Sequence, residues 1–270
     1  MSSKNTPIFL PDGKNAIHDG IEHEPGGGKA LLEGGPMIKS VSMPLAASLM
    51  AALVLSSALV SAAVPPSAPR PTLLVGDRWV YNVTSGIGMT KTTYQETREV
   101  TTVDASGIKV QVTGKTVDGR DFTRVEDLPA AGELRSGAPC IDQAYRFQTP
   151  LQRVVFPIVP GERSAKWVDA VSEPGGVKGQ FNYSFHTLNW DKQTVPAGSF
   201  DAIRVDVSMM LNDATAFRHG TQCNFTYWYS PAVRGTVRER RTAMYNGAIA
   251  VGDTQVLNAS YELASFTPGK

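Results

Sequence analysis

The sequence predicts an all-β protein, an antiparallel meander of about ten to twelve strands that forms a half-barrel, a barrel or a sandwich, with little helix. Three observations support this prediction. Apolar and polar residues alternate over long stretches, turn signals recur between them, and no amphipathic pattern is long enough for more than a turn or two of helix. The alternation of strand and helix patterns that marks a parallel sheet is absent from the sequence.

The clearest predicted strand follows a turn at residues 195–202. Pro196 fixes φ and Gly198 provides a position open to positive φ, so the chain can reverse its direction there. In the strand that follows, apolar residues occupy every second position from Ile203 to Leu211. Polar residues occupy the other positions except Met210. This alternation predicts a strand with one buried and one solvated face.

Two further predicted strands, at residues 180–190 and 222–230, carry aromatic rings on one face. The second strand ends at Pro231, which cannot donate a ladder hydrogen bond. The six aromatic residues are Phe181, Tyr183, Phe185, Phe225, Tyr227 and Tyr229. They could line a cavity for a lipid or another hydrophobic ligand, or they could simply form the core.

Shorter patterns predict the remaining strands. They lie at Arg78–Val83, Lys91–Val103, Ile108–Val112, Arg120–Val125, Val233–Met244 and Thr254–Phe266. The stretch from Asp127 to Pro139 is predicted to be a loop. The apolar stretch Leu151–Val159 is interrupted by proline and is predicted to be a buried crossing segment.

Three short motifs resemble those of a family of exported bacterial β-rich domains of unknown function. Members often carry a V-P-A-G-T-F-D-A turn, a Y-W-Y-x-P element and an opening V-G-D-x-W-x-Y element; the counterparts here are residues 195–202, 227–231 and 75–81. The resemblance covers roughly residues 72–266. Ser199 replaces the usual threonine, and residues 232–235 depart from the usual turn of small residues. The resemblance implies an exported β-domain and offers no catalytic residues.

The first 71 residues have the pattern of an export signal and are not predicted to belong to the folded domain. Residues 1–36 are polar and rich in turn signals, so we expect a disordered segment, or a leader assigned upstream of the true start. Residues 37–63 have the basic start, apolar middle and small terminal residues of a signal peptide, with cleavage after Ala62 or Ala63. The alternative is an uncleaved inner-membrane signal anchor.

Residues 64–71 form a predicted proline-rich linker, and residues 72–270 form a predicted single β-domain. The approach to Trp167 loosely echoes the approach to Trp79, so the domain could consist of two similar halves. Cys140 and Cys223 are the only cysteines. In an oxidising compartment an even number of cysteines favours a disulfide, and two buried free thiols are the alternative.

The sequence contains no common catalytic or metal-binding motif: no G-x-S-x-G, no H-E-x-x-H, no phosphate-binding glycine loop and no paired-cysteine zinc spacing. His186 and His219 could act only with partners supplied by the fold. We therefore predict no enzymatic activity, no metal and no cofactor.

Arg234, Arg238 and Arg240 are predicted to share one strand face. They could bind an anionic glycan, a lipid head group or an acidic partner, or they could be a solvated face that protects an edge strand.

The leading hypothesis is a periplasmic or secreted protein of the cell envelope that binds a ligand or partner through its β-domain. Its partner would be a lipid, a glycan or an envelope protein, and the membrane would be touched only through the signal segment. With 26 basic and 25 acidic residues, nothing directs the chain to nucleic acid. The alternatives are a structural or assembly factor for envelope complexes and a hydrolase with an unrecognised site.

Overall fold

The computed structural model describes residues 66–116, 119–140, 143–213, 221–246 and 254–270. The predicted leader and signal peptide lie outside these residues. The described part contains twelve strands and one short 3-10 helix, η1 (Pro231–Val233). The strands are β1 (Arg78–Ile87), β2 (Thr90–Asp104), β3 (Gly107–Lys115), β4 (Asp121–Leu128), β5 (Glu133–Gly137), β6 (Ala144–Gln152), β7 (Arg163–Glu173), β8 (Lys178–Val195), β9 (Gly198–Asp213), β10 (Thr221–Ser230), β11 (Gly235–Asn246) and β12 (Thr254–Thr267).

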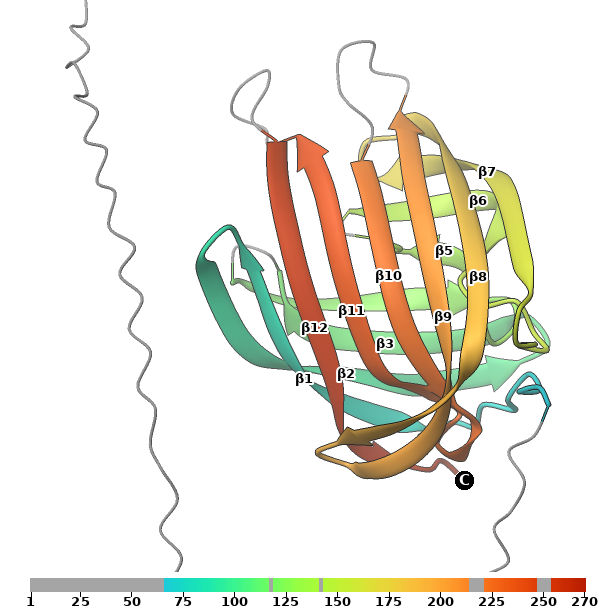
Figure 1. The fold of residues 1–270 in the computed structure, drawn as a ribbon. Coiled ribbons are helices and arrows are strands. Elements are labelled where there is room, and N and C mark those ends of the chain that lie inside the picture. Colours follow the sequence, from blue (N-terminus) through green and yellow to red (C-terminus); the bar gives the residue numbers. More distant parts are fainter. Residues whose placement is uncertain (1–65, 117–118, 141–142, 214–220, 247–253) are drawn as a thin grey trace, which may run out of the picture. The chain divides into compact units, whose positions relative to one another are not determined.

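The strands form one closed antiparallel barrel. Each strand pairs with the next in the sequence, and β12 pairs with β1 to close the sheet. In Figure 1, β8–β12 run side by side in one wall, and β3, β5 and β6 run behind them across their direction. The all-β meander predicted from the sequence is confirmed, and of the three architectures left open the barrel is the one formed. No helix in the described ranges is long and apolar enough to cross a membrane.

Strand β9 shows how alternation becomes burial. Its inward residues from Ile203 to Leu211 are all buried, whereas Met210 on the outer face is 42% exposed. The strand begins earlier than predicted, because Val195 pairs with Gly198 across a tight turn and residues 199–202 pair with 191–194 of β8. Gly198 has a φ of +132° at this turn, a backbone conformation that residues other than glycine rarely adopt.

Two segments differ from the prediction. The region predicted to be a loop contains β5, a short strand that pairs with β4 through only Asp127 and Ser136. The predicted crossing segment is partly β6, which runs to Gln152, and the chain leaves the sheet only afterwards. Both strands have weak alternation of their own and gain their order from neighbours, which a local pattern cannot reveal.

The opening motif closes one end of the barrel. Asp77 is completely buried and accepts hydrogen bonds from the backbone amides of Leu74 and Gly269, both at 2.8 Å. It also accepts hydrogen bonds from Nη1 of Arg234, at 2.9 and 3.0 Å. In the preceding segment, Ala68 exchanges two backbone hydrogen bonds with Ile158. One carboxylate therefore fastens the start of the barrel, its last residues and the approach to β11.

Candidate functional site

A cavity of about 200 Å³ lies inside the barrel. Its wall is mainly apolar, and its residues come from both walls of the barrel and from the segments between strands. The apolar lining includes Leu73, Trp79, Val110, Leu128, Val154, Phe156, Val207 and Met209. Ligand sites in proteins are typically concave, mostly apolar and equipped with a few polar groups, and this cavity fits that description.

Three of the six aromatic residues singled out in the sequence lie on the cavity wall. Phe225, Tyr227 and Tyr229 of β10 line it. The hydroxyl of Tyr229 is buried and has no hydrogen-bond partner among the described residues. Burial raises its pKa, so the hydroxyl stays protonated. It places an unsatisfied polar group on an otherwise apolar part of the wall.

The three aromatic residues of β8 are not among the residues that line the cavity in the described structure. Phe181 packs edge-on against Tyr145 and Phe147, with ring centroids 5.0 and 5.3 Å apart. Tyr183 packs against Phe185 at 5.4 Å. Phe181 and Tyr183 therefore pack in the core, whereas the buried Phe185 also lines a second pocket formed by β7, β8, β9 and β10.

A layer of charged side chains crosses the interior beside the apolar wall. It comes from β2, β4, β11 and the residue after β6, and three of its ion pairs join residues two apart on one strand. Such residues lie on the same face of a strand. The charged layer consists of Glu96, Arg98, Arg124, Glu126, Arg153, Glu239 and Arg241.

Glu126 forms a two-point ion pair with Arg153 in the charged layer. Nη1 and Nη2 of Arg153 donate to its two carboxylate oxygens at 2.7 and 3.0 Å. Burial alone would raise the pKa of Glu126, but Arg153 and Arg124 lower it to about 2. The pKa of Glu239 is also lowered, against the effect of burial, chiefly by Arg241 and Arg98. Both acids are therefore ionised at any physiological pH.

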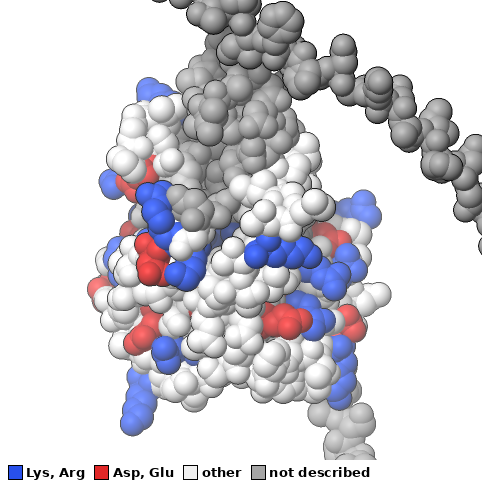
Figure 2. All heavy atoms as spheres, turned by 90° about the vertical axis from the view of Figure 1, so that its left-hand side faces the viewer, with Lys and Arg blue, Asp and Glu red and all other residues white. Residues whose placement is uncertain are grey.

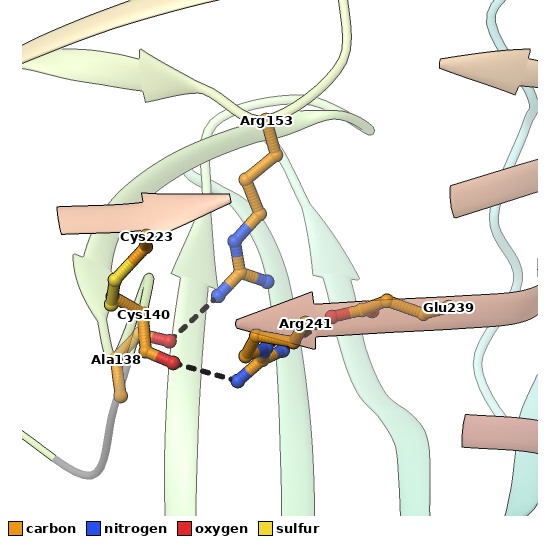
Figure 3. The surroundings of a disulfide bond; sticks show 6 residues. All are labelled: Ala138, Cys140, Arg153, Cys223, Glu239 and Arg241. Carbon is orange, nitrogen blue, oxygen red and sulfur yellow. Dashed lines mark hydrogen bonds and ion pairs between the residues drawn. A yellow bond between two sulfur atoms is a disulfide. The ribbon is translucent and has the colours of Figure 1, made fainter. Parts of the chain in front are cut away.

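A disulfide between Cys140 and Cys223 fastens the loop after β5 to β10, with the two Cα atoms 6.1 Å apart. This is the disulfide favoured by the cysteine count. Figure 3 shows two arginines of the charged layer reaching this loop. Arg153 donates to the carbonyl oxygen of Ala138 at 3.2 Å, and Arg241 donates to that of Cys140 at 2.8 Å. The disulfide thus holds two backbone acceptors against the charged layer.

Of the three predicted anion-binding arginines, Arg238 and Arg240 alternate with the buried Val237 and Glu239 and share the outer face of β11. The expectation is wrong for Arg234, because β11 begins at Gly235 and Arg234 has a positive φ of 53° in the turn before it. Its guanidinium pairs with Asp77. Arg238 donates to Glu262 and Gln193, at 2.9 and 2.8 Å, and Arg240 lies over the ring of Trp228.

On the face drawn in Figure 2, basic and acidic side chains of the described residues are interspersed and form no continuous basic patch. His186 is half-buried on the outer face of β8, where its pairing partner on β9 is Asp206. His219 lies outside the described residues. Within the described ranges, no group of three or more histidine, cysteine or acidic residues could hold a metal ion.

The charged layer is what sequence reasoning missed. The sequence signal was present as three charge pairs spaced by two, at residues 96/98, 124/126 and 239/241. The charge pairs on β2 and β11 lie an even number of residues from a buried apolar residue, Val100 on β2 and Val237 on β11, and so share its strand face. These pairs were not predicted to face inward, because charged side chains are rarely buried unless they are paired.

No protein-family model and no curated protein matches the chain. The distantly similar solved structures include three of bacterial proteins. One is a candidate lipoprotein of Parabacteroides distasonis, and another is a candidate exported protein of Bacteroides fragilis with a YmcC-like fold. Each is 14% identical to this chain and covers 74% of it, with a TM-score of 0.43. The match covers 97% of the first protein and 99% of the second. The hypothetical lipoprotein YmcC of Escherichia coli is 8% identical, with a TM-score of 0.37 over 71% of this chain and 85% of its own. The function is therefore argued from the cavity itself.

Proposed function

We propose that this protein is an exported, non-enzymatic binding protein whose barrel encloses one small, largely apolar ligand. The observation that carries the proposal is the cavity of about 200 Å³ with an apolar wall and a few polar groups directed at it. A void of this size inside a close-packed protein lacks the dispersion contacts that an occupant would supply. An apolar ligand that fills it gains those contacts and leaves water at the same time.

Two features support export. The disulfide joins residues 83 positions apart, and structural disulfides persist in oxidising compartments such as the periplasm and the extracellular space. The predicted signal peptide at residues 37–63 supplies the route. We expect the mature protein to begin near Val64, which N-terminal sequencing of the protein recovered from the periplasm or the medium checks.

The cavity can be tested with a simple apolar probe, 1-octanol, followed by NMR of the tryptophan indole N–H groups. Trp79 lines the cavity and donates to the carbonyl oxygen of Val233 at 2.8 Å, whereas Trp167 is 61% exposed on β7. We expect octanol to shift the indole signal of Trp79 in a saturable way and to leave that of Trp167 unchanged.

A pair of substitutions on β9 makes this test specific. Val207 lines the cavity, whereas Val205 faces inward on the same strand, is 2% exposed and is not among the lining residues. We expect Val207→Phe to fill the cavity and weaken octanol binding at least tenfold, while Val205→Phe affects stability by overpacking but keeps binding. If octanol leaves the Trp79 signal unmoved, or if both variants bind it equally, the protein does not use this cavity, and a structural role in the envelope becomes the better explanation.

A further inference from the structure

The charged layer carries an excess of positive charge. It contains four arginines and three glutamates, and the two glutamates at its centre, Glu126 and Glu239, have lowered pKa values and stay ionised. The layer therefore has a formal charge of +1. Burying charge without a counterion is costly, so an anion drawn from outside the chain would be favoured beside it.

The four arginines differ in how many of their N–H groups donate a hydrogen bond within the protein. Arg153 and Arg241 each donate to a glutamate and to a backbone carbonyl. Arg98 donates only through Nε, to Glu96 at 2.8 Å. Arg124 makes an ion-pair contact of 3.5 Å between Nε and Glu126, and its guanidinium lies over the ring of Phe122, 4.5 Å from the centroid. Among the described residues, the terminal amino groups of Arg98 and Arg124 have no hydrogen-bond acceptor.

The sheet register places these two arginines side by side. Arg98 of β2 pairs with Val112 of β3, and Val112 pairs with Arg124 of β4, so the three residues form one row on the inner face. Two strand spacings, about 10 Å, separate the Cα atoms of the arginines. Both side chains line the cavity. Their amino groups can therefore converge on one group placed over Val112.

Two aromatic rings hold the guanidinium of Arg98 in place, in addition to its ion pair with Glu96. Its guanidinium lies over the rings of Tyr81 and Tyr261, at 5.1 and 5.7 Å from their centroids. Burial raises the pKa of the Tyr81 hydroxyl, which therefore stays neutral and donates to the carbonyl oxygen of Thr236 at 2.9 Å. The aromatic rings orient the guanidinium and leave its outer amino groups available.

The apolar part of the cavity extends away from this row. Leu128 is four residues beyond Arg124 on β4, about 13 Å along the strand. Phe156 packs against Tyr229, with ring centroids 5.3 Å apart, and both line the same cavity. A polar end and an apolar end are thus joined in one space.

Resting on the proposed function, we infer that the ligand is a single-chain amphiphile with an anionic head. Its carboxylate or phosphate accepts hydrogen bonds from the terminal amino groups of Arg98 and Arg124, and its chain lies against Leu128, Phe156 and Tyr229. An engineered cavity of about 150 Å³ holds benzene, so a cavity of about 200 Å³ suits a ligand of roughly eight to ten heavy atoms. Octanoate, with ten heavy atoms, matches this size, and octyl phosphate, with thirteen, would extend its chain end to the cavity mouth.

The test compares four compounds with the same chain and different heads: octanoate, octyl phosphate, octanol and octylamine. Affinities are measured by calorimetry on the disulfide-bonded mature protein, after bound lipid has been removed, with the Trp79 signal as the indicator of site. We expect at least one anion to bind about tenfold or more tightly than octanol, because hydrogen bonds to charged groups are stronger than those to neutral ones. Octylamine should bind most weakly.

Substitution of the arginines assigns the head group. Arg98→Met and Arg124→Met should each reduce the ratio of anion affinity to octanol affinity at least fivefold. The affinity for octanol itself should stay within about twofold of the wild type. Arg98→Lys should restore part of the anion preference that Arg98→Met removes. The matched control is Arg204→Met, because Arg204 forms a pair spaced by two with Asp206 on the outer face of β9, at 3.0 Å. It should change none of the four affinities.

The outcomes separate the two proposals. Octanol binding as tightly as both anions, or a preference that survives both arginine substitutions, would overturn the anionic head while leaving the apolar cavity intact. If none of the four compounds moves the Trp79 signal, the proposed function itself fails. A preference for only one anion supports the inference and names the head group.

Discussion

At the scale of single residues, buried carboxylates organise this protein. Asp77 joins the start of the barrel, its end and Arg234, and Glu126 holds Arg153 within the charged layer. Each accepts several charged or backbone donors, which is the condition under which a buried charge is tolerated. Removing an acceptor leaves the donors buried and unsatisfied, so these positions are sensitive to changes of a single atom.

Replacing Asp77 with asparagine tests the first of these acids. The substitution removes the negative charge that faces Arg234 and one of the two acceptor oxygens. We expect the free energy of unfolding to fall by about 2 kcal/mol, in the range for hydrogen bonds to charged groups. Urea denaturation measures this loss. Asp169→Asn on the exposed face of β7 is the control and should have almost no effect.

Glu126 gives a pH dependence with a defined sign. Its pKa is about 2 in the folded protein against 4.5 for an unperturbed glutamate, so its ionised form favours folding. This contribution is complete above about pH 4.5 and is lost as the pH falls from there towards 2. The groups facing Glu126 are Arg153, Arg124 and Arg98, which stay charged throughout this range.

The measurement compares the wild type with Glu126→Gln. We expect the wild type to be the more stable protein at pH 6, and the difference in unfolding free energy to shrink steadily between pH 4.5 and 3. A constant difference across this range would show that Glu126 is not ionised against its arginines in the folded state. Urea denaturation at each pH provides the values.

At the scale of elements, the disulfide couples a loop to a strand that lies far away in the sequence. The disulfide closes a loop of 83 residues, and on the chain-entropy model it stabilises the folded state by about 4 kcal/mol because it restricts the unfolded chain. The same bond holds Cys140 where its carbonyl oxygen accepts from Arg241. Without the disulfide, this loop after β5 would be held by the hydrogen bonds of Arg153 and Arg241 to its carbonyl oxygens and by the short strand before it.

We therefore expect the double variant Cys140→Ser, Cys223→Ser to lose about 4 kcal/mol of unfolding free energy. Reduction of the wild type should give the same loss, and it should have no effect on the double variant. Equal stability of oxidised and reduced protein in urea would contradict this prediction. The NMR signal of the Arg241 side chain should also shift, because its carbonyl acceptor is no longer held in place.

The strands also show where prediction from sequence succeeded and where it stopped. Long strands such as β8 and β9 were predictable, because strict alternation over many residues is compatible only with one buried sheet face. Strands β5 and β6 were not, since their order comes from neighbours. The inward charge pairs were not predicted to be buried, because a charge pair spaced by two has the same sequence pattern on a buried face as on a solvated one.

At the scale of the whole molecule, closure of the barrel creates the site. Pairing of β1 with β12 brings Arg98 of β2 towards Tyr261 of β12, and it places the apolar wall inside a closed sheet. An open half-barrel would leave that wall in water and the charged layer hydrated. Closure therefore produces both the low-dielectric space and the uncompensated charge on which the proposed binding depends.

The sequence by itself determined the all-β class, the meander order and the cysteines available for a disulfide, because these follow from local alternation, turn residues and cysteine count. Only the tertiary structure decided that the sheet closes, that Phe225, Tyr227 and Tyr229 line the cavity of the candidate site, and that the interior holds an excess arginine. These properties depend on contacts between strands distant in the sequence. The physical reason is that burial and pairing are set by the environment a residue enters, and its neighbours in the chain do not specify that environment.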